Sequence, residues 1–365
     1  MSSPDFSSRS VMIVAGGTGG HVYPGLAVAH ALKERGIKLY WMGTRQGLEA
    51  RVVPQHGFPL CLIPVSGLRR TSLLRWLTAP AIVTLAVVEA IIAIVKTNPR
   101  VVLGMGGFVS GPGGVAAWLC RRPLVIHEQN AVPGLTNRLL RRLARCVLEA
   151  FPGSFPEDAM AVTTGNPIRA EIISIDAPGD RLASREGVNV LVFGGSRGAR
   201  ALNEQVPFAI NASGVRDMRV RHQCGVNEVE STRARYRLGE GITHVEIEAY
   251  IDDMAGAYRW ADIVIARAGA ITIAEIAACG IASILIPYPY AVDDHQTINA
   301  RYLSDKGAAV LLPEHEMTTE SLCTLLVRVL NDRNALIDMA MRARALALPS
   351  ATQDVAKHCV EFIDA

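Results

Sequence analysis

The sequence lacks the patterns of a disulfide-stabilised, secreted or nucleic-acid-binding protein. Its seven cysteines are an odd number and form no C-x-x-C pair, so they are expected to be reduced core thiols of a cytoplasmic protein. The first ten residues hold no apolar signal core and are expected to be a short flexible lead-in. The net charge of +3 is too small to indicate nucleic acid, and no such partner is expected.

Apolar residues and glycine are abundant instead. Half of the 365 residues are hydrophobic, 19% are charged and 32 are glycine. This composition is typical of well-packed α/β proteins with many glycine-containing loops, and it argues against disorder. A chain of this length is long for a single core, so we expect two domains.

One plan of strand, glycine-rich loop and helix occurs twice along the chain. The first copy is an apolar run at 11–15 followed by the loop 16–21, and the second is 189–193 followed by 194–199. N–H groups at the start of a helix favour a phosphate or diphosphate, although a tight turn alone would also explain the glycines. The first loop lacks the G-x-G-x-x-G spacing and no acid ends the next strand, which argues against an NAD-dependent dehydrogenase.

This repeat of architecture predicts two doubly wound, Rossmann-like α/β domains whose facing loops form a cleft. We expect the domains to span residues 1–170 and 171–345, with an interdomain linker near 175–180. The segment from residue 317 shows only helical patterns. Its last helix, 346–365, is expected to pack back onto the first domain.

The central pattern of the chain is a strand at 261–266 that leads into a helix through Ala268, Gly269 and Ala270. Such a turn brings N–H groups and the positive end of the helix dipole to the edge of a sheet, where an anion or nucleotide can bind. Glu275 follows one turn inside the helix on an otherwise apolar face. It could accept both hydroxyls of a ribose, or it could be only a dipole partner of the helix.

Two further clusters of polar residues follow buried strands. One is the loop 287–299, which carries acid, amide and imidazole groups, and the other is 127–130. Because neighbouring βα loops meet at the carboxyl ends of parallel strands, the first cluster and Glu275 predict a shared site. The second cluster also favours a site, although His127 alone could be a core histidine.

The segment 65–95 departs from the alternation of strands and helices. An apolar helix from Ala81, interrupted by Glu89, is expected to be too short for a membrane span and to pack in the core. The residues before it could touch a membrane surface or form an ordinary loop. These residues are Arg69, Arg70, Leu73, Leu74, Arg75, Trp76 and Leu77.

A cationic helix at 135–145 is either a solvated face or a second contact with anionic lipid. Its cations are Arg138, Arg141, Arg142 and Arg145.

Six glycine-rich or polar motifs occur in order at 16–21 (GGTGGH), 104–114 (GMGGFVSGPGG), 127–130 (HEQN), 165–169 (GNPIR), 194–199 (GGSRGA) and 267–275 (RAGAITIAE). Together they resemble the MurG family of bacterial N-acetylglucosamine transferases over essentially the whole chain after residue ten. The resemblance implies a type B glycosyltransferase fold. It also implies inverting transfer of N-acetylglucosamine from UDP-N-acetylglucosamine to lipid I, which gives lipid II in peptidoglycan synthesis.

The implied location is peripheral, on the anionic cytoplasmic surface of the inner membrane. Proteins of cell-wall synthesis are further candidate partners.

The resemblance also implies roles for individual residues. Ile251 is expected to contact uracil through its backbone, and Glu275 is expected to hold the ribose. The diphosphate is expected to bind Ser196 and the turn formed by Ala270, Ile271, Thr272, Ile273, Ala274 and Glu275. The donor sugar is expected to face Asn130 and Gln296, and the cleft to be lined by Thr18, Gly19, Gly20 and Arg169. The sequence departs from the family pattern at Arg197, where glutamine is usual, and at His295.

Inverting transfer needs a base for the acceptor hydroxyl and fixed dipoles for the charge that grows on the diphosphate. His21 is the first candidate base, because imidazole titrates near neutrality and this one follows a glycine loop, and Glu128 is the second. Helix and loop N–H groups can supply the dipoles, and the chain has no D-x-D triplet to hold a divalent ion. We therefore expect catalysis without a metal or other cofactor. The alternatives are a UDP-sugar epimerase or hydrolase of the same fold and a non-catalytic nucleotide-sugar sensor.

Overall fold

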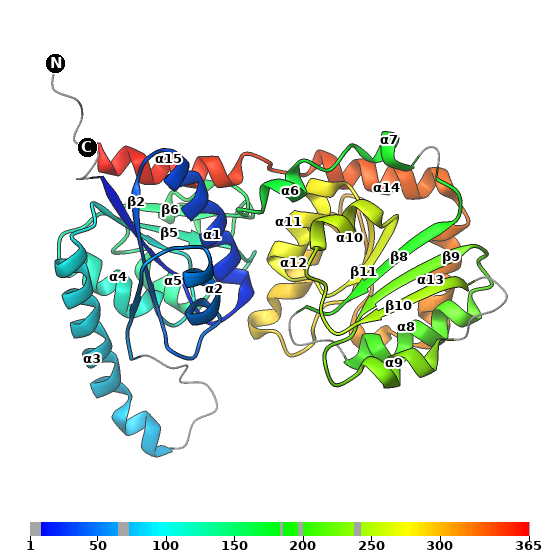
Figure 1. The fold of residues 1–365 in the computed structure, drawn as a ribbon, viewed down its shortest axis with the longest axis horizontal. Coiled ribbons are helices and arrows are strands. Elements are labelled where there is room, and N and C mark those ends of the chain that lie inside the picture. Colours follow the sequence, from blue (N-terminus) through cyan, green and yellow to red (C-terminus); the bar gives the residue numbers. More distant parts are fainter. Residues whose placement is uncertain (1–8, 65–72, 183–184, 196–199, 237–241, 365) are drawn as a thin grey trace. The chain divides into compact units, whose positions relative to one another are not determined.

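The computed structural model describes residues 9–64, 73–182, 185–195, 200–236 and 242–364, and for residues 73–79 and 292 it describes the backbone alone. The chain forms two compact units. The first consists of Met1–Arg169 and Pro349–Ala365, and the second of Ala170–Leu348. Each unit is a parallel sheet covered by helices (Figure 1).

The first unit has a sheet in the order β3-β2-β1-β4-β5-β6-β7, with every described pair parallel. Its strands are β1 (Ser10–Val14), β2 (Lys38–Gly43), β3 (Leu60–Leu62), β4 (Val101–Gly104), β5 (Leu124–Glu128), β6 (Cys146–Glu149) and β7 (Val162–Thr163). Its helices are α1 (Gly19–Glu34), α2 (Glu49–Gln55), α3 (Leu73–Thr97), α4 (Ser110–Leu119), α5 (Leu135–Leu140) and α15 (Ala351–Ile363).

Both faces of this sheet are buried, which explains why its central strands are continuous apolar runs. Along β1, Val11 and Ile13 belong to a hydrophobic cluster with residues of α1 and α15. Met12 and Val14 belong to a second cluster, on the other face, with residues of α3 and α4. Burial of each such side chain contributes about 1.5–3 kcal/mol to folding.

The second unit repeats the same plan, with the order β10-β9-β8-β11-β12-β13 and parallel pairing throughout the described strands. Its strands are β8 (Val188–Phe193), β9 (Met218–Gln223), β10 (Ile242–Glu248), β11 (Ile263–Ala266), β12 (Ala282–Leu285) and β13 (Val310–Leu311). Its helices are α6 (Ala170–Ile173), α7 (Pro178–Leu182), α8 (Arg200–Ala212), α9 (Val229–Arg235), α10 (Met254–Trp260), α11 (Ala270–Cys279), α12 (His295–Ser304), α13 (Thr319–Leu330) and α14 (Arg333–Ala345).

The two sheets confirm the predicted fold class of two Rossmann-like doubly wound α/β domains. The chain from residue 317 is helical as predicted, forming α13, α14 and α15. The last of these helices packs against α1 in the first unit, where the two lie side by side in Figure 1 (red and blue).

The apolar helix after residue 65 differs from the prediction. It begins at Leu73 instead of Ala81, has 25 residues and continues through Pro80. Ala86, Ala90 and Ile94 pack into the core, but the opposite face is exposed, with Ile92 at 59% and Val95 at 68%. Within the described residues, Pro80–Thr97 is the one helical stretch long and apolar enough to cross a membrane, and 17% of it is buried in the protein. The prediction that the helix is too short for a membrane span is therefore wrong, and the prediction that it packs in the core holds for one face alone.

Two smaller predictions also fail. The stretch 175–180 is not an interdomain linker, because it lies inside the second unit, where Ile175 is buried and α7 packs on α14. The cationic helix is shorter than predicted, since α5 ends at Leu140 and three of its four arginines follow the helix.

Candidate functional site

In each sheet the strand order reverses at one place, and there the neighbouring loops leave in opposite directions. The reversal lies between β1 and β4 in the first unit and between β8 and β11 in the second. Ligands of open α/β sheets bind outside the carboxyl ends of the strands at such a point. The three glycine-rich loops at 16–21, 104–114 and 194–199 and the motif at 267–275 all begin at these strand ends.

The loop after β1 presents exposed backbone at the start of a helix. Thr18 has the extended backbone of an N-cap but makes no side-chain capping bond, and α1 begins at Gly19. Gly17, Thr18 and Gly20 are exposed, whereas Gly16 is buried. The first N–H groups of α1 therefore face outward at the positive end of the helix dipole, where an anion is favoured.

A buried carboxylate on α2 forms a hydrogen bond with the backbone of this loop. Glu49, which is fully buried, accepts hydrogen bonds from the Gly17 N–H at 2.9 Å and from the Thr44 N–H and hydroxyl at 2.8 and 2.7 Å. A Cβ atom on Gly16 would lie 2.5 Å from Oε1 of Glu49, so the loop needs glycine there. Sequence analysis missed Glu49, because a single acid inside the run 47–51 carries no recognisable pattern.

The predicted polar cluster at 127–130 meets His21 in the structure. His21 Nδ1 lies 3.0 Å from Gln129 Oε1, Gln129 Nε2 lies 3.1 Å from His127 Nδ1, and His127 Nε2 lies 2.9 Å from the Gly165 carbonyl oxygen. His127 and Gln129 are buried, and His21 is half-buried. Burial lowers the pKa of His127 to about 4, so its ring is neutral at neutral pH.

The second candidate base, Glu128, has a different environment. It lies within β5, is 2% exposed, and its two carboxylate oxygens are occupied by neighbouring donors. Oε1 accepts from the Asn130 N–H at 3.0 Å and from its side-chain amide at 3.3 Å. Oε2 accepts from the Gly134 N–H at 3.1 Å and from the Asn137 side chain at 2.9 Å. Glu128 thus organises the loop after β5.

In the second unit, α11 begins at Ala270 as predicted, with Gly269 as an N-cap that has no side-chain hydrogen bond. Ile271, Thr272 and Ala274 are half-buried, so their surfaces are accessible at the start of the helix. Ile273 differs, because its side chain is fully buried and its N–H donates to the Gly269 carbonyl at 2.9 Å.

Glu275 is 8% exposed and accepts a hydrogen bond from the hydroxyl of the buried Tyr258 at 3.0 Å. Tyr258 lies on α10, the helix that follows the loop of Ile251. This contact fixes one carboxylate oxygen of Glu275. Sequence analysis missed Tyr258, because its position relative to Glu275 depends on how α10 packs on α11.

The loop after β12 is tied to the loop after β11. Arg267 donates to the carbonyl oxygens of Ile286 and Pro287 at 3.2 and 3.0 Å and forms an ion pair with Glu314. Gln296, in the first turn of α12, accepts from the Tyr288 N–H at 2.9 Å. These bonds hold the two neighbouring loops together. The amide nitrogen of Gln296 takes no part in its bond to Tyr288.

The other predicted site residues have these positions. Ile251 is buried just before α10, and no backbone hydrogen bond within the described residues uses its N–H or carbonyl. Asn130 and Arg169 are half-buried in the first unit. Ser196 and Arg197 lie outside the described residues. Leu73, Leu74, Arg75, Trp76 and Leu77 lie in the part of α3 described by backbone alone, and Arg69 and Arg70 lie outside the described residues.

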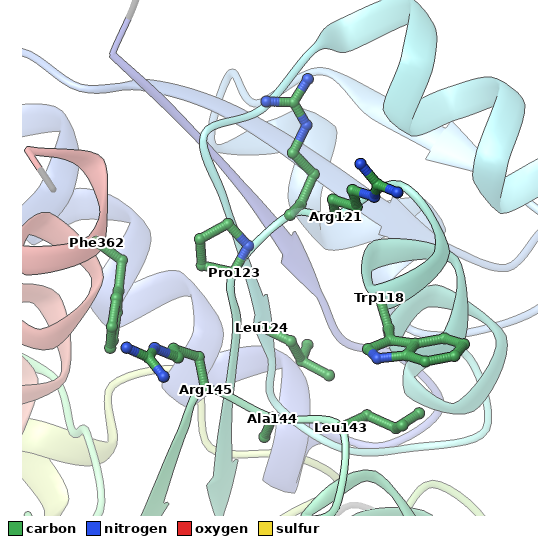
Figure 2. A pocket seen from close by; sticks show the side chains of 9 residues that line it. Trp118, Arg121, Pro123, Leu124, Leu143, Ala144, Arg145 and Phe362 are labelled. Atoms are coloured by element: carbon green, nitrogen blue, oxygen red, sulfur yellow. The ribbon is translucent and has the colours of Figure 1, made fainter.

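A depression of about 410 Å³ lies on the first unit away from these loops (Figure 2). Its lining residues are Trp118, Arg121, Arg122, Pro123, Leu124, Leu143, Ala144, Arg145 and Phe362. Leu124 begins β5 and Arg145 precedes β6, so the depression lies at the amino ends of the strands. Nucleotides bind such folds at the carboxyl ends of the strands, where the glycine loops lie. The depression is at the opposite end of the sheet.

Within the described residues, no group of three or more His, Cys, Asp or Glu side chains is arranged to hold a metal ion.

Comparison with known proteins identifies the family. The glycosyltransferase family 28 N-terminal domain matches residues 11–149, and the glycosyltransferase family 28 C-terminal domain matches residues 189–357. Two relatives carry the name UDP-N-acetylglucosamine–N-acetylmuramyl-(pentapeptide) pyrophosphoryl-undecaprenol N-acetylglucosamine transferase. The one from Marinobacter nauticus is 48% identical over 98% of both chains. The one from Nitrosococcus oceani is 50% identical over 96% of this chain and 98% of its own.

Solved structures agree with this assignment. The crystal structure of MurG from Acinetobacter baumannii superimposes with a TM-score of 0.83 at 39% identity, covering 97% of this chain and 99% of that one. A UDP-N-acetylglucosamine 2-epimerase superimposes with a TM-score of 0.65 at 15% identity, which shows a shared fold alone. The chain belongs to glycosyltransferase family 28 and, within it, to the MurG family of N-acetylglucosamine transferases.

Proposed function

We propose that the protein transfers N-acetylglucosamine from UDP-N-acetylglucosamine to the muramyl sugar of lipid I, giving lipid II for peptidoglycan synthesis. The observation that carries this proposal is the 48–50% identity to transferases of that name over at least 96% of both chains. Both switch points of the fold carry the loops that such a reaction needs. Other proteins of cell-wall synthesis stay predicted partners.

The donor nucleotide binds the second unit. Glu275 accepts the ribose hydroxyls, and the backbone of Ile251 pairs with uracil. The start of α11 and Ser196 hold the diphosphate, since N–H groups at a helix N-terminus favour anions. The side chains of Gln296 and Asn130 face the donor sugar. The glycine N-cap of α11 and the buried Tyr258–Glu275 contact support this arrangement.

The first unit supplies the base. His21 takes the proton of the acceptor hydroxyl as oxygen attacks the anomeric carbon, and UDP leaves from the opposite face with inversion. Thr18, Gly19, Gly20 and Arg169 bind the reactants beside it. The four hydrogen bonds to the buried Glu128 favour His21 as the base. Fixed N–H dipoles stabilise the departing diphosphate, so the reaction runs without a metal.

The protein binds the anionic cytoplasmic surface of the inner membrane through one apolar face of the first unit. This face, here called the α3–α5 face, consists of exposed side chains on three helices that pack consecutively, α3 on α4 and α4 on α5. Its members are Leu85, Val88, Ile92, Val95, Trp118, Leu119, Leu135 and Leu139. The exposed Arg138 lies within α5, and the exposed Arg142 and Arg145 follow that helix; cations beside apolar side chains favour anionic lipid.

Acceptor dependence tests the proposed activity. Purified protein is incubated with UDP-N-acetylglucosamine, with and without a soluble short-chain lipid I analogue, and UDP release is measured. Release that requires the acceptor supports the transferase. Release without acceptor would indicate a hydrolase, and conversion of the donor to its C2 epimer would indicate an epimerase.

A further inference from the structure

An unbroken line of hydrogen bonds runs from His21 into the core of the first unit and ends on the backbone. It passes through the side chains of Gln129 and His127 to the carbonyl oxygen of Gly165. A backbone carbonyl can only accept a hydrogen bond. The direction of every bond in the line can therefore be worked out from this fixed end.

The His127 end determines where that ring carries its proton. Nε2 faces the Gly165 carbonyl at 2.9 Å, so Nε2 must be the protonated nitrogen. The ring is fully buried and neutral, as its lowered pKa of about 4 indicates, so Nδ1 holds a lone pair and accepts.

The amide of Gln129 is then oriented by two acceptors. Its nitrogen lies 3.1 Å from His127 Nδ1 and 3.3 Å from the His127 carbonyl oxygen. Because neither of these atoms can donate, the amide nitrogen belongs on this side and Oε1 belongs on the side of His21. Oε1 in turn can only accept, so His21 Nδ1, at 3.0 Å, must be the donor.

We infer that Gln129 and His127 are positioning residues that hold neutral His21 as the tautomer protonated on Nδ1, with the lone pair on Nε2. Within the described residues the His21 ring makes one hydrogen bond, and it uses Nδ1. The tautomer follows from the hydrogen bonds together with the burial of the neutral His127 ring. Its catalytic meaning rests on the proposed function, in which Nε2 is the atom that takes the proton.

The backbone around the line is shaped to permit it. Gly106, in the second glycine loop, has φ +93°, and a Cβ atom there would lie 2.8 Å from His21 Nδ1. Gly165 has φ +85°, a conformation that glycine adopts without strain, and its carbonyl reaches His127. Asn166 donates to the Gln129 carbonyl at 3.0 Å and holds the end of β5 in place. These contacts join three of the six sequence motifs to His21.

The proton balance of the transfer agrees with this arrangement. The acceptor hydroxyl forms a C–O bond to the anomeric carbon and gives its proton to His21 Nε2. The bond between that carbon and the diphosphate oxygen breaks, and its electron pair leaves with UDP. The resulting imidazolium keeps its Nδ1–H bond to Gln129, so no second proton has to move.

Nitrogen NMR of full-length protein labelled with ¹⁵N-histidine tests the tautomer directly. The His21 signals are assigned by their loss in His21→Gln. At a pH where His21 is neutral, we expect a protonated-type resonance for Nδ1 and an unprotonated-type resonance for Nε2. The opposite pattern in the wild-type protein would overturn the inference, whatever the activity.

Variants test the role of the amide. Gln129→Met, of similar size but without an acceptor, is expected to shift His21 toward the Nε2-protonated tautomer and to lower kcat by roughly tenfold or more, with KM for UDP-N-acetylglucosamine little changed. Gln129→Glu keeps an acceptor oxygen and should retain the Nδ1-protonated tautomer. Gln353→Met, at an exposed position on α15, is the control and should change neither readout. An unchanged His21 tautomer in Gln129→Met would contradict the inference.

These outcomes separate the inference from the proposed function. If the tautomer is as expected but His21→Ala turns over normally, His21 is not the base, and the inference that Gln129 and His127 set its tautomer still holds. If His21→Ala is inactive but the tautomer is reversed, the inference about Gln129 and His127 is wrong, and the proposed function is unaffected.

Discussion

Glu275 gives the first test at the scale of single residues. If it accepts two ribose hydroxyls, Glu275→Ala should weaken binding of UDP-N-acetylglucosamine by about 1.5–3 kcal/mol, the range for hydrogen bonds to a charged group. Calorimetric titration measures this change. Tyr258→Phe removes one bond to the same carboxylate, so we expect a smaller loss of about 0.5–1.5 kcal/mol.

A 2′-deoxyribose donor is the control for Glu275. It should bind the wild-type protein more weakly, and Glu275→Ala should cost it little further. Wild-type affinity for UDP in Glu275→Ala would show that the carboxylate is only a partner of the helix dipole.

His21 gives the second residue-scale prediction. His21→Ala should lower kcat roughly 100-fold or more with little change in donor affinity, as expected for a lost general base. His315→Ala, on an exposed side chain of the second unit, is the matched control. Addition of a chelator should change the rate of neither protein, and inhibition by chelator that magnesium reverses would contradict the metal-free mechanism.

Two buried histidines predict how stability depends on pH. Burial lowers the pKa of His127 to about 4 and of His222 to about 3, from an ordinary value of 6.5. As the pH falls below about 6.5, the unfolded chain takes up protons at these sites and the folded chain does not. The free energy of unfolding should therefore fall as the pH drops from 6.5 toward 4, by up to roughly 1.4 kcal/mol per pH unit for each histidine.

Urea unfolding at pH 7 and pH 5 measures this dependence. His222→Gln, which removes one titrating group, should make the fall smaller than in wild type, whereas the exposed His244→Gln should not. An identical pH dependence in His222→Gln and wild type would show that burial of His222 is not what sets it.

Sequence analysis identified residues that stand in motifs and missed those that support them. Glu275, His21 and Gln296 lie in loops whose patterns point to chemistry. Glu49 and Tyr258 contact these loops only through the packing of other elements. The Gln129–His21 contact joins residues 108 positions apart. Its two partners stood in separate motifs, and only the fold shows that they meet.

At the scale of elements, the strands that could be predicted from the sequence are those buried on both faces of a sheet. The central strands β1, β4, β8 and β11 are fully buried and consist mainly of apolar residues, with Ser10 in β1 and Asn189 in β8 as buried polar exceptions. The edge strands β3, β7 and β13 were not predicted, because they have two or three residues that are half-buried or exposed. The long helix α3 was misjudged for a related reason, since its apolar side chains cover an exposed face as well as a buried one.

The α3–α5 face gives the prediction at this scale. Trp118→Ser with Leu139→Ser should release the protein from anionic vesicles and leave UDP binding unchanged, because these side chains are 53% and 65% exposed and pack little in the protein. Activity should fall on acceptor embedded in vesicles and persist on a soluble short-chain acceptor. Vesicle sedimentation measures the binding.

A matched control lies on the second unit. Phe208→Ser with Met341→Ser removes two apolar side chains of similar exposure, 45% and 48%, and should leave vesicle binding intact. Equal sedimentation of the Trp118 and Leu139 double variant and wild type would place the membrane contact elsewhere.

At the scale of the whole molecule, the sequence repeat was enough to predict two domains of one plan, because each restarts with a strand and a glycine loop. The strand orders that create a switch point in each sheet come from the structure. The structure also shows that the first unit contains residues from both ends of the chain, because α15 packs against α1. In the proposed division of labour, the second unit holds the donor and the first supplies the base and the membrane contact.

The configuration of the product tests this account most directly. Purified protein is given UDP-N-acetylglucosamine, in which the sugar is the α-anomer, and a soluble short-chain lipid I analogue, and the product is examined by mass spectrometry and proton NMR. The account predicts one N-acetylglucosamine added to the muramyl sugar through a β-linkage, with no product from His21→Ala in the same time. An α-linked product, or free N-acetylglucosamine without any disaccharide, would contradict it.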